Sequence, residues 1–279
     1  RPRPEGDRVT PSLPLAGSEG TTVRTERRDG GYAMVTLDRP DAGNSLSARL
    51  VADLAATVRD LAHGDEPPKA VVVTGAGRFF CAGADLKERD RPAAWLDDVR
   101  AAFDALAALP ALVIAAINGP CMGGGLELAL ACDVRLAARS ARLGLPEIRF
   151  GALPAAGGPQ RLARVIGPGR TKLLVCTGRH LSAEEAEAMG VVDQVVDDGD
   201  LVAAAEALAA EAAAHALYAI AAAKAAVDGG ADAGLAEALR LEYRIIDTMA
   251  GPDERAAEVR RAMERSSTYG RIFASEKEQ

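Results

Sequence analysis

Two glutamates, each beside a turn rich in glycine or proline, are the residues of this sequence best suited to chemistry. Glu127 follows three consecutive glycines that end at Gly125, and Glu147 follows Pro146. When two carboxyl groups share a partly apolar cleft, one can keep its proton while the other is ionised, so the pair supplies an acid and a base to one substrate. The sequence therefore predicts acid–base catalysis by Glu127 and Glu147.

Two glycine-bearing loops could bring backbone amides up to a ligand. One contains Gly83 and Ala84, and the other is the glycine run before Glu127. Glycine allows a close approach of the backbone, and the first N–H groups of a helix have no partner within it. Three consecutive glycines would each cost about 1 kcal/mol inside a regular helix. We therefore expect these loops to bind an oxyanion rather than to serve only as tight turns.

The elements that must position these loops alternate between apolar strands and helices. Residues 70–74 and 112–117 are short apolar runs typical of strands buried on both faces, and residues 32–38 also have strand character. The first two runs each lead into a glycine-bearing loop. This recurrence of strand, loop and helix predicts an α/β fold of repeated β-β-α units.

Helical signals are strong at two places. After Ser47, a plausible N-cap, one stripe of a helix would carry four apolar side chains: Leu50, Leu54, Val58 and Leu61. Ser182 and Glu185 have the spacing of a capping box. Beyond residue 157 the sequence favours helices at residues 160–166, 170–177, 182–189, 201–214 and 233–248, interrupted by one strand at residues 191–196.

These patterns predict three segments. Residues 1–20 are rich in proline and glycine and are expected to form a disordered arm. Residues 21–198 would form the core with the active site, and residues 199–279 a helical subdomain. The last of these is suited to contacts between subunits.

Composition excludes several classes of protein. The chain has 279 residues, 48% of them hydrophobic, and a net charge of −7, which argues against a protein that binds nucleic acid through a basic face. Its longest apolar runs are too short to span a membrane. The four cysteines lack the paired spacing of a zinc site, so we expect no metal and reduced, buried thiols at Cys81, Cys121, Cys132 and Cys176. With no continuous apolar segment near residue 1, a cytoplasmic location is expected.

Four motifs, in order, give the chain a family resemblance over about residues 22–265. They are Arg39-Pro40 with Asn44-Ser45-Leu46-Ser47, then Phe80-Cys81-Ala82-Gly83-Ala84-Asp85-Leu86-Lys87, then Ala115 to Asp133 around Asn118-Gly119, and Leu145-Pro146-Glu147. The chain resembles the crotonase superfamily, also called the enoyl-CoA hydratase/isomerase family. The resemblance implies a crotonase (ClpP-like) fold with a C-terminal helical trimerisation subdomain, and assembly as a homotrimer or homohexamer.

The resemblance also implies roles for the site residues. The backbone N–H groups of Ala84 and Gly124 would bind the thioester oxygen of an acyl-CoA and stabilise the enolate. The family position matched by Glu147 exchanges a proton with C2, and the one matched by Glu127 holds and activates water. The implied reaction is syn addition of water to a 2-enoyl-CoA. Double-bond isomerisation, another reaction through the same enolate, and a non-catalytic binding role remain alternatives.

The coenzyme A part of the substrate would lie along one segment, and no separate cofactor is implied. Ala84, Asp85, Leu86 and Lys87 match positions that line the thioester end and the pantetheine, and Lys87 is equally consistent with a solvated surface lysine. Two departures from the family pattern are Pro159, in place of the usual threonine, and an atypical C-terminal segment. These departures leave the shape of the loop beside Glu147, and the acyl specificity, open.

Overall fold

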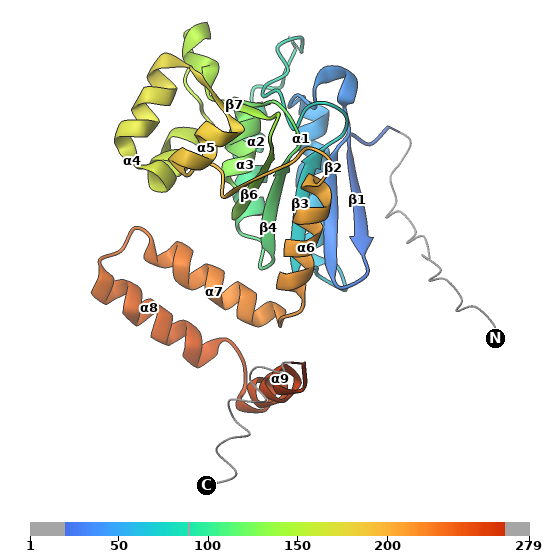
Figure 1. Ribbon diagram of the computed structural model, residues 1–279, viewed down its shortest axis with the longest axis vertical. Helices are drawn as coiled ribbons and strands as arrows, with labels where there is room; N and C mark the ends of the chain where they lie inside the picture. Colours follow the sequence, from blue (N-terminus) through green and yellow to red (C-terminus); the bar gives the residue numbers. More distant parts are fainter. Residues whose placement is uncertain (1–19, 89, 266–279) are drawn as a thin grey trace, which may run out of the picture. The chain divides into compact units, whose positions relative to one another are not determined.

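The structure, a computed structural model, describes residues 20–88 and 90–265 and divides into two compact units (Figure 1). The core unit ends at Ala214, and the C-terminal unit begins at His215. The expected arm at residues 1–20 lies outside the described residues except for Gly20.

A six-stranded sheet forms the centre of the core unit, with β1 at one edge and β9 at the other. Its first two strands are antiparallel, and every later pair is parallel. In spatial order the strands are β1 (Val23–Arg28), β2 (Tyr32–Leu37), β3 (Ala70–Gly75), β4 (Leu112–Ile117), β6 (Val134–Ala138) and β9 (Gln194–Val196). Because β3 and β4 are parallel, their carboxyl ends, and the loops that follow them, lie at the same end of the sheet.

Both faces of this sheet are buried, which explains the continuous apolar runs in its middle strands. Alternate side chains point to opposite faces: Val73 belongs to the cluster under α1 (Ala48–His63) and α2 (Trp95–Ala107), and Val72 to the cluster under α6 (Leu201–Ala213). Figure 1 shows α6 lying along the sheet strands. The sheet is therefore a rigid support for the loops at its ends.

The strongest helical predictions are confirmed. In α1, Ser47 accepts the N–H of Leu50 as the N-cap, and the predicted stripe is buried. Helix α5 (Ala183–Met189) begins with the predicted capping box of Ser182 and Glu185. Helix α4 (Gly158–Thr177) contains a break at Gly167, which lies between the two helices expected there.

A second, small sheet was not predicted. Its order is β5 (Cys121–Met122), β7 (Arg142–Gly144) and β8 (His180–Ser182), and it lies next to α3 (Gly124–Leu130) and to η2, the 3-10 helix Pro146–Phe150. Strands of two or three residues are too short to show a period of two. This sheet fixes the segment that leads into Glu147.

The C-terminal unit contains α7 (Leu217–Gly230), α8 (Leu235–Thr248) and α9 (Pro252–Arg265). Helices α7 and α8 pack closely, because a Cβ on Gly229 would stand 2.5 Å from Leu241 Cδ2. The sequence predicts a boundary between the two units after residue 198. In the structure it falls after Ala214, because α6 packs on the central sheet.

Two polar residues hold strands of the core unit together. Asp133, at the end of the third motif, exchanges hydrogen bonds with the backbone of Val113 through its N–H and its carboxylate. The acidic residues near Asp193 in the sequence predict a solvated turn there. Asp193 does lie in an exposed bend, with a side chain that is 45% exposed, and its carboxylate also binds the N–H and the buried guanidinium of Arg135.

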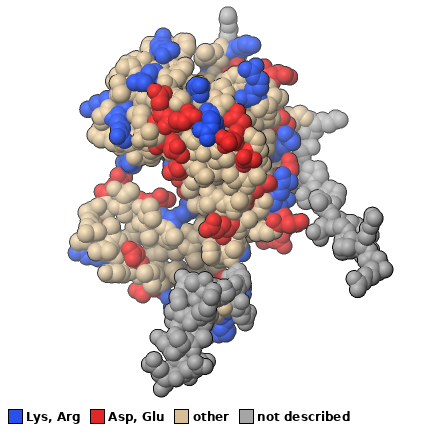
Figure 2. Space-filling view, in the orientation of Figure 1, with Lys and Arg blue, Asp and Glu red and all other residues tan. Residues whose placement is uncertain are grey.

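Three of the cysteines are buried and free, whereas Cys176 is exposed and departs from the expectation for all four. Among the described residues, no cluster of three or more histidine, cysteine or carboxylate side chains could hold a metal ion. Within the same part of the chain, no single helix is long and apolar enough to cross a membrane, and only α6 and α7 taken together pass that test. Figure 2 shows acidic side chains gathered near the middle of the visible face of the core unit, with basic side chains around them.

Candidate active site

The backbone around Ala84 is arranged so that its own N–H points away from the neighbouring segment. Leu46 pairs with Ala84 as an isolated parallel bridge: its N–H donates to Gly83 O at 2.8 Å, and its C=O accepts the N–H of Asp85 at 3.4 Å. In a parallel bridge the residue between these two bonds turns its N–H and C=O to the opposite side. The N–H of Ala84 is therefore directed out of this pairing.

Gly83 brings this loop against the start of α3. Its φ of +90° is unfavourable for side-chain-bearing residues, and a Cβ there would stand 2.7 Å from Met122 O and 3.3 Å from Gly124 N. Conversely, the Cβ position of Gly124 lies 3.9 Å from Ala84 N. The N–H groups of Ala84 and Gly124 are thus neighbours, and neither has an acceptor among the described residues. Together they can bind one oxyanion.

Glu127 lies one turn into α3 and is held by the backbone of another segment. Its Oε1 accepts the N–H groups of Ala156 and Gly158, both at 2.8 Å, and the residue is only 4% exposed. Burial raises the pKa of Glu127, although these two N–H groups and the charges of nearby arginines act to lower it. The backbone bonds fix the carboxylate while leaving Oε2 for a ligand.

Pro159 does not disturb this arrangement. It stands in the first turn of α4, where a missing N–H leaves no helical bond broken. The N–H that reaches Glu127 belongs to Gly158, the residue before it. The substitution of proline for the family's usual threonine is therefore compatible with the placement of Glu127.

Glu147, in η2, lies beside the same glycine run. A Cβ on Gly123 would stand 2.7 Å from Glu147 Oε1, and Oε2 is a buried oxygen without a hydrogen-bond partner in the described part of the chain. Burial, and secondarily the negative charge of Glu127, raise the pKa of Glu147 to about 7. The two predicted acids therefore interact, and one of them retains a proton near neutral pH.

The expected coenzyme-binding segment has two exposed residues and one buried one. Leu86 is 70% exposed and Lys87 is exposed, so both are available to a ligand. The carboxylate of Asp85 instead turns into the protein, where it pairs with Arg39 at 3.0 Å and accepts the N–H of Lys87. Burial would raise the pKa of Asp85, but these partners lower it overall. Asp85 thus shapes the loop and does not present its carboxylate to the ligand.

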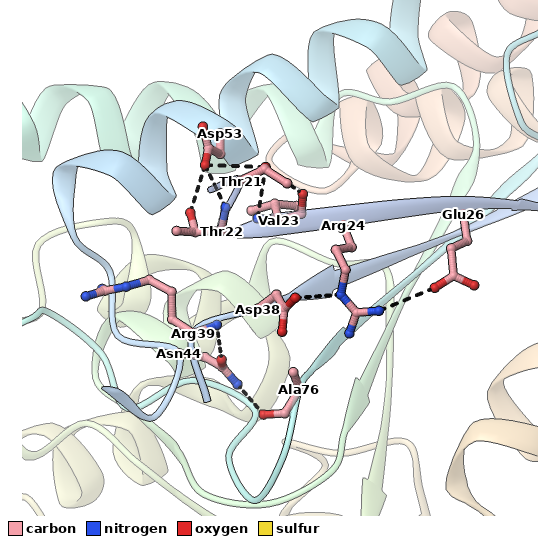
Figure 3. Close-up of polar contacts among 10 residues, drawn as sticks. All are labelled: Thr21, Thr22, Val23, Arg24, Glu26, Asp38, Arg39, Asn44, Asp53 and Ala76. Atoms are coloured by element: carbon pink, nitrogen blue, oxygen red, sulfur yellow. Dashed lines mark hydrogen bonds and ion pairs between the residues drawn. The ribbon is translucent and has the colours of Figure 1, made fainter. Parts of the chain in front are cut away.

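Arg39 and Asn44 belong to the first motif, and the sequence predicts no individual role for them. In the structure they hold neighbouring loops together through hydrogen bonds. Figure 3 shows Asn44 accepting the N–H of Arg39 and donating to Ala76 O, and both distances are within hydrogen-bond range, at 2.9 and 3.0 Å. Asn44 also has a φ of +54° and is fully buried. The available signal was an asparagine shortly after Arg39-Pro40, since asparagine is one of the few residues that tolerate a positive φ and bond to nearby backbone.

The site thus combines two acids of different environment with two adjacent amide donors. Such donors stabilise negative charge that develops on a carbonyl oxygen during reaction. The acids can move protons at carbon or at water beside that carbonyl. This set of groups suits reactions that pass through an enolate.

Comparison with known proteins agrees with this chemistry. Over 229 residues the chain is 42% identical to YngF of Bacillus subtilis, whose name assigns it to the enoyl-CoA hydratases/isomerases, covering 80% of this chain and 86% of that one. An enoyl-CoA isomerase/hydratase of Mycosarcoma maydis is 39% identical over 226 residues, covering 76% and 82%. The crystal structure of an enoyl-CoA hydratase from Bacillus anthracis matches with a TM-score of 0.80 and 37% identity, over 84% of this chain and 93% of that one.

The likeness covers both units and all four motifs. Residues 27–268 match the enoyl-CoA hydratase/isomerase family, and the neighbours in structure are enoyl-CoA hydratases with the crotonase fold. The fold expected from sequence is confirmed. This chain belongs to the enoyl-CoA hydratase/isomerase family and has the crotonase fold.

Proposed function

We propose that this protein is an enoyl-CoA hydratase that adds water reversibly, with syn geometry, to a 2-enoyl-CoA thioester and gives the 3-hydroxyacyl-CoA. The thioester oxygen is bound by the N–H groups of Ala84 and Gly124, which the fold leaves adjacent. The coenzyme part runs along Leu86 and Lys87, and no separate cofactor takes part.

In this mechanism the product gains the elements of water: the hydroxyl at C3 comes from the water molecule, and the proton at C2 comes from Glu147. Glu127 accepts a proton from water as the water oxygen bonds to C3, and the electron pair of the double bond moves to form the enolate. Glu147 then donates its proton to C2, and the enolate collapses to the thioester. The proton gained by Glu127 replaces the one lost by Glu147 after exchange through solvent, which returns the pair to its starting charge.

The observation that carries the proposal is the pair of buried acids. Glu127 is held by two N–H groups that favour its ionised form, whereas Glu147 has a buried oxygen with no partner and a pKa raised to about 7. Hydration needs a base and an acid at once, and these two environments supply them. Isomerisation is the second candidate, since one acid suffices to move a proton between carbons and a relative carries both activities in its name.

One experiment separates the two reactions. Purified protein is incubated with a panel of 2-enoyl-, 3-enoyl- and 3-hydroxyacyl-CoA esters, and the conjugated absorbance is followed. We expect wild-type protein to hydrate 2-enoyl esters, and Glu127→Gln to lose about 10²- to 10⁴-fold in kcat, the usual contribution of a general base. Isomerisation that survives in Glu127→Gln, with no hydration by wild type, would favour the second candidate. No turnover of any ester would favour a binding role.

We also propose that the protein works in the cytoplasm as a homotrimer or homohexamer, without nucleic-acid or membrane partners. The C-terminal unit supports the assembly, because its helices expose several large apolar side chains: Val227, Leu235, Tyr243, Ile246 and Val259. Surfaces of this kind suit contacts between subunits.

A further inference from the structure

One peptide group links Glu127 to an arginine at the surface. Its N–H belongs to Ala156 and donates to Glu127 Oε1 at 2.8 Å. Its C=O belongs to Ala155 and accepts Nε of Arg100, on α2, also at 2.8 Å. Hydrogen bonds in series polarise one another, so a cation at the carbonyl strengthens donation by the N–H. Arg100 thus acts on Glu127 through a single peptide group.

The next peptide group is held in a similar way from α4. Arg161 Nη1 donates to Ala156 O at 3.0 Å, and its Nη2 pairs with Asp104 of α2 at 2.6 Å. A Cβ on Gly157 would occupy the space that the Arg161 guanidinium fills. The turn that binds Glu127 is therefore held by hydrogen bonds from arginines of both α2 and α4.

Burial and the charged groups around Glu127 act in opposite directions on its pKa. Burial opposes its ionisation and raises its pKa, while Arg161 and Arg100 favour the ionised form; the charge of Glu127 in turn raises the pKa of Glu147. Arg100 is the one most open to substitution, because its side chain is 47% exposed and its ion-pair partner, Asp97, lies on the same helix. Changing it leaves the core packing intact.

We propose that Arg100 is a positioning residue for Glu127, acting through the Ala155 to Ala156 peptide group, with Arg161 and Asp104 completing the support of that turn. The kinetic part of this inference rests on the proposed hydratase function. The structural part rests only on the hydrogen bonds to the turn.

The test therefore measures Glu127 directly as well as turnover. In a Glu147→Gln background, which removes the coupled acid, the carboxylate of Glu127 is titrated by isotope-edited infrared spectroscopy and identified by its loss in Glu127→Gln. We expect Arg100→Ala to shift the titration midpoint of Glu127 upward and Arg100→Lys to restore part of the shift. Arg139→Ala is the matched control, because Arg139 is 56% exposed and pairs only with Asp197 and Glu184 in the described structure. In Arg139→Ala the titration midpoint of Glu127 should equal that of the Glu147→Gln protein.

The kinetic arm uses the enzyme with Glu147 intact. Arg100→Ala should lower kcat for hydration about 10-fold, the lower end of the effect of residues that orient catalytic ligands, with KM within about twofold. Circular dichroism checks the fold, and Arg100→Gln serves if Arg100→Ala does not fold. An unchanged titration midpoint overturns the inference, whatever happens to kcat. If Arg100→Ala shifts the midpoint but the wild type hydrates no enoyl-CoA, Arg100 still positions Glu127. The proposed hydratase function is then overturned.

Discussion

Glu147 owes its chemistry to its surroundings more than to its type. An ordinary glutamate is ionised well below neutral pH, but burial beside Gly123 and the charge of Glu127 hold the pKa of this one at about 7. Glu127, only one turn from Gly124, is instead tied down by two N–H donors. Two side chains of the same type thus take different roles because the backbone around each differs.

The pH dependence of turnover follows from the one proton that Glu127 and Glu147 must carry between them for either direction of the reaction. Hydration needs that proton on Glu147 and dehydration needs it on Glu127, so both directions use the same total protonation state. We expect kcat/KM to fall in both directions as the pH rises through about 7. Initial rates from pH 5 to 9 with an enoyl ester and its hydroxyacyl product would check this. If kcat/KM fell at different pH values in the two directions, this prediction would be wrong.

The same acid should leave a trace in stability. Because the pKa of Glu147 is raised in the folded state, protonation favours folding, and this contribution is complete below the unfolded pKa of about 4.3 and lost as the pH rises through about 7. Over that window the thermal midpoint of wild type should fall relative to that of Glu147→Gln. Calorimetry of both proteins measures the difference. Parallel curves would show that Glu147 is not protonated in the folded state.

At this scale the sequence predicts which residue types gather but not where each side chain turns. Spacing and glycine content drew attention to both acids and to the two glycine-bearing loops, because these are features of local sequence, and the family resemblance singled out the amides of Ala84 and Gly124. The inward turn of Asp85 toward Arg39, and the pairing of Asp193 with buried Arg135, depend on partners far along the chain. Charged residues in turns are usually solvated, so the burial of Asp85 (8% exposed) could not be predicted from composition.

At the scale of elements, the site depends on how closely the loop after β3 approaches the start of α3. Gly83 permits this approach by its positive φ and by leaving room for Met122 O. A side chain there would push the Ala84 and Gly124 amides apart. The contact between two loops, rather than either loop alone, makes the donor pair.

Substitution at Gly83 should therefore affect both stability and activity. In Gly83→Ala we expect the left-handed backbone to cost about 1–2 kcal/mol and hydration to fall by about 10²-fold as the donors separate. Gly30→Ala is the matched control, with φ of +99° and no atom nearer than 3.9 Å to the new Cβ. It should lose similar backbone stability and keep full kcat. Urea unfolding and initial rates measure both; equal kcat in the two variants would contradict the account.

The elements themselves were predictable where a pattern was long enough to read. Helix α1 was predicted from a stripe of four regularly placed apolar residues, and the buried strands β3 and β4 from continuous apolar runs. The small sheet of β5, β7 and β8 was missed because its strands are held by neighbours and not by their own pattern. The placement of α6 in the core unit was missed for a related reason, since an alanine-rich helix shows no sharp apolar stripe.

At the scale of the whole molecule, the C-terminal unit should govern assembly. Leu235 and Tyr243 of α8 are 77% and 58% exposed, which is costly for a chain that remains alone in water. We expect sedimentation equilibrium to give three or six times the chain mass of 28.9 kDa. Leu235→Glu combined with Tyr243→Glu should lower that mass without loss of helix content. A wild type that sediments as a monomer at micromolar concentration would refute the proposed assembly.

The edge strand β1 has a consequence for how these proteins behave when crowded. In the described structure β1 has a neighbour on one side only, and an edge of this kind can recruit further strands and start fibrils. Figure 3 shows Arg24 of β1 reaching Asp38 and Glu26, so this border is lined with charge. At the opposite border, β9 has only three residues. Addition of further strands to either edge is thereby discouraged, and stored or overexpressed protein should resist amyloid growth that starts at β1 or β9.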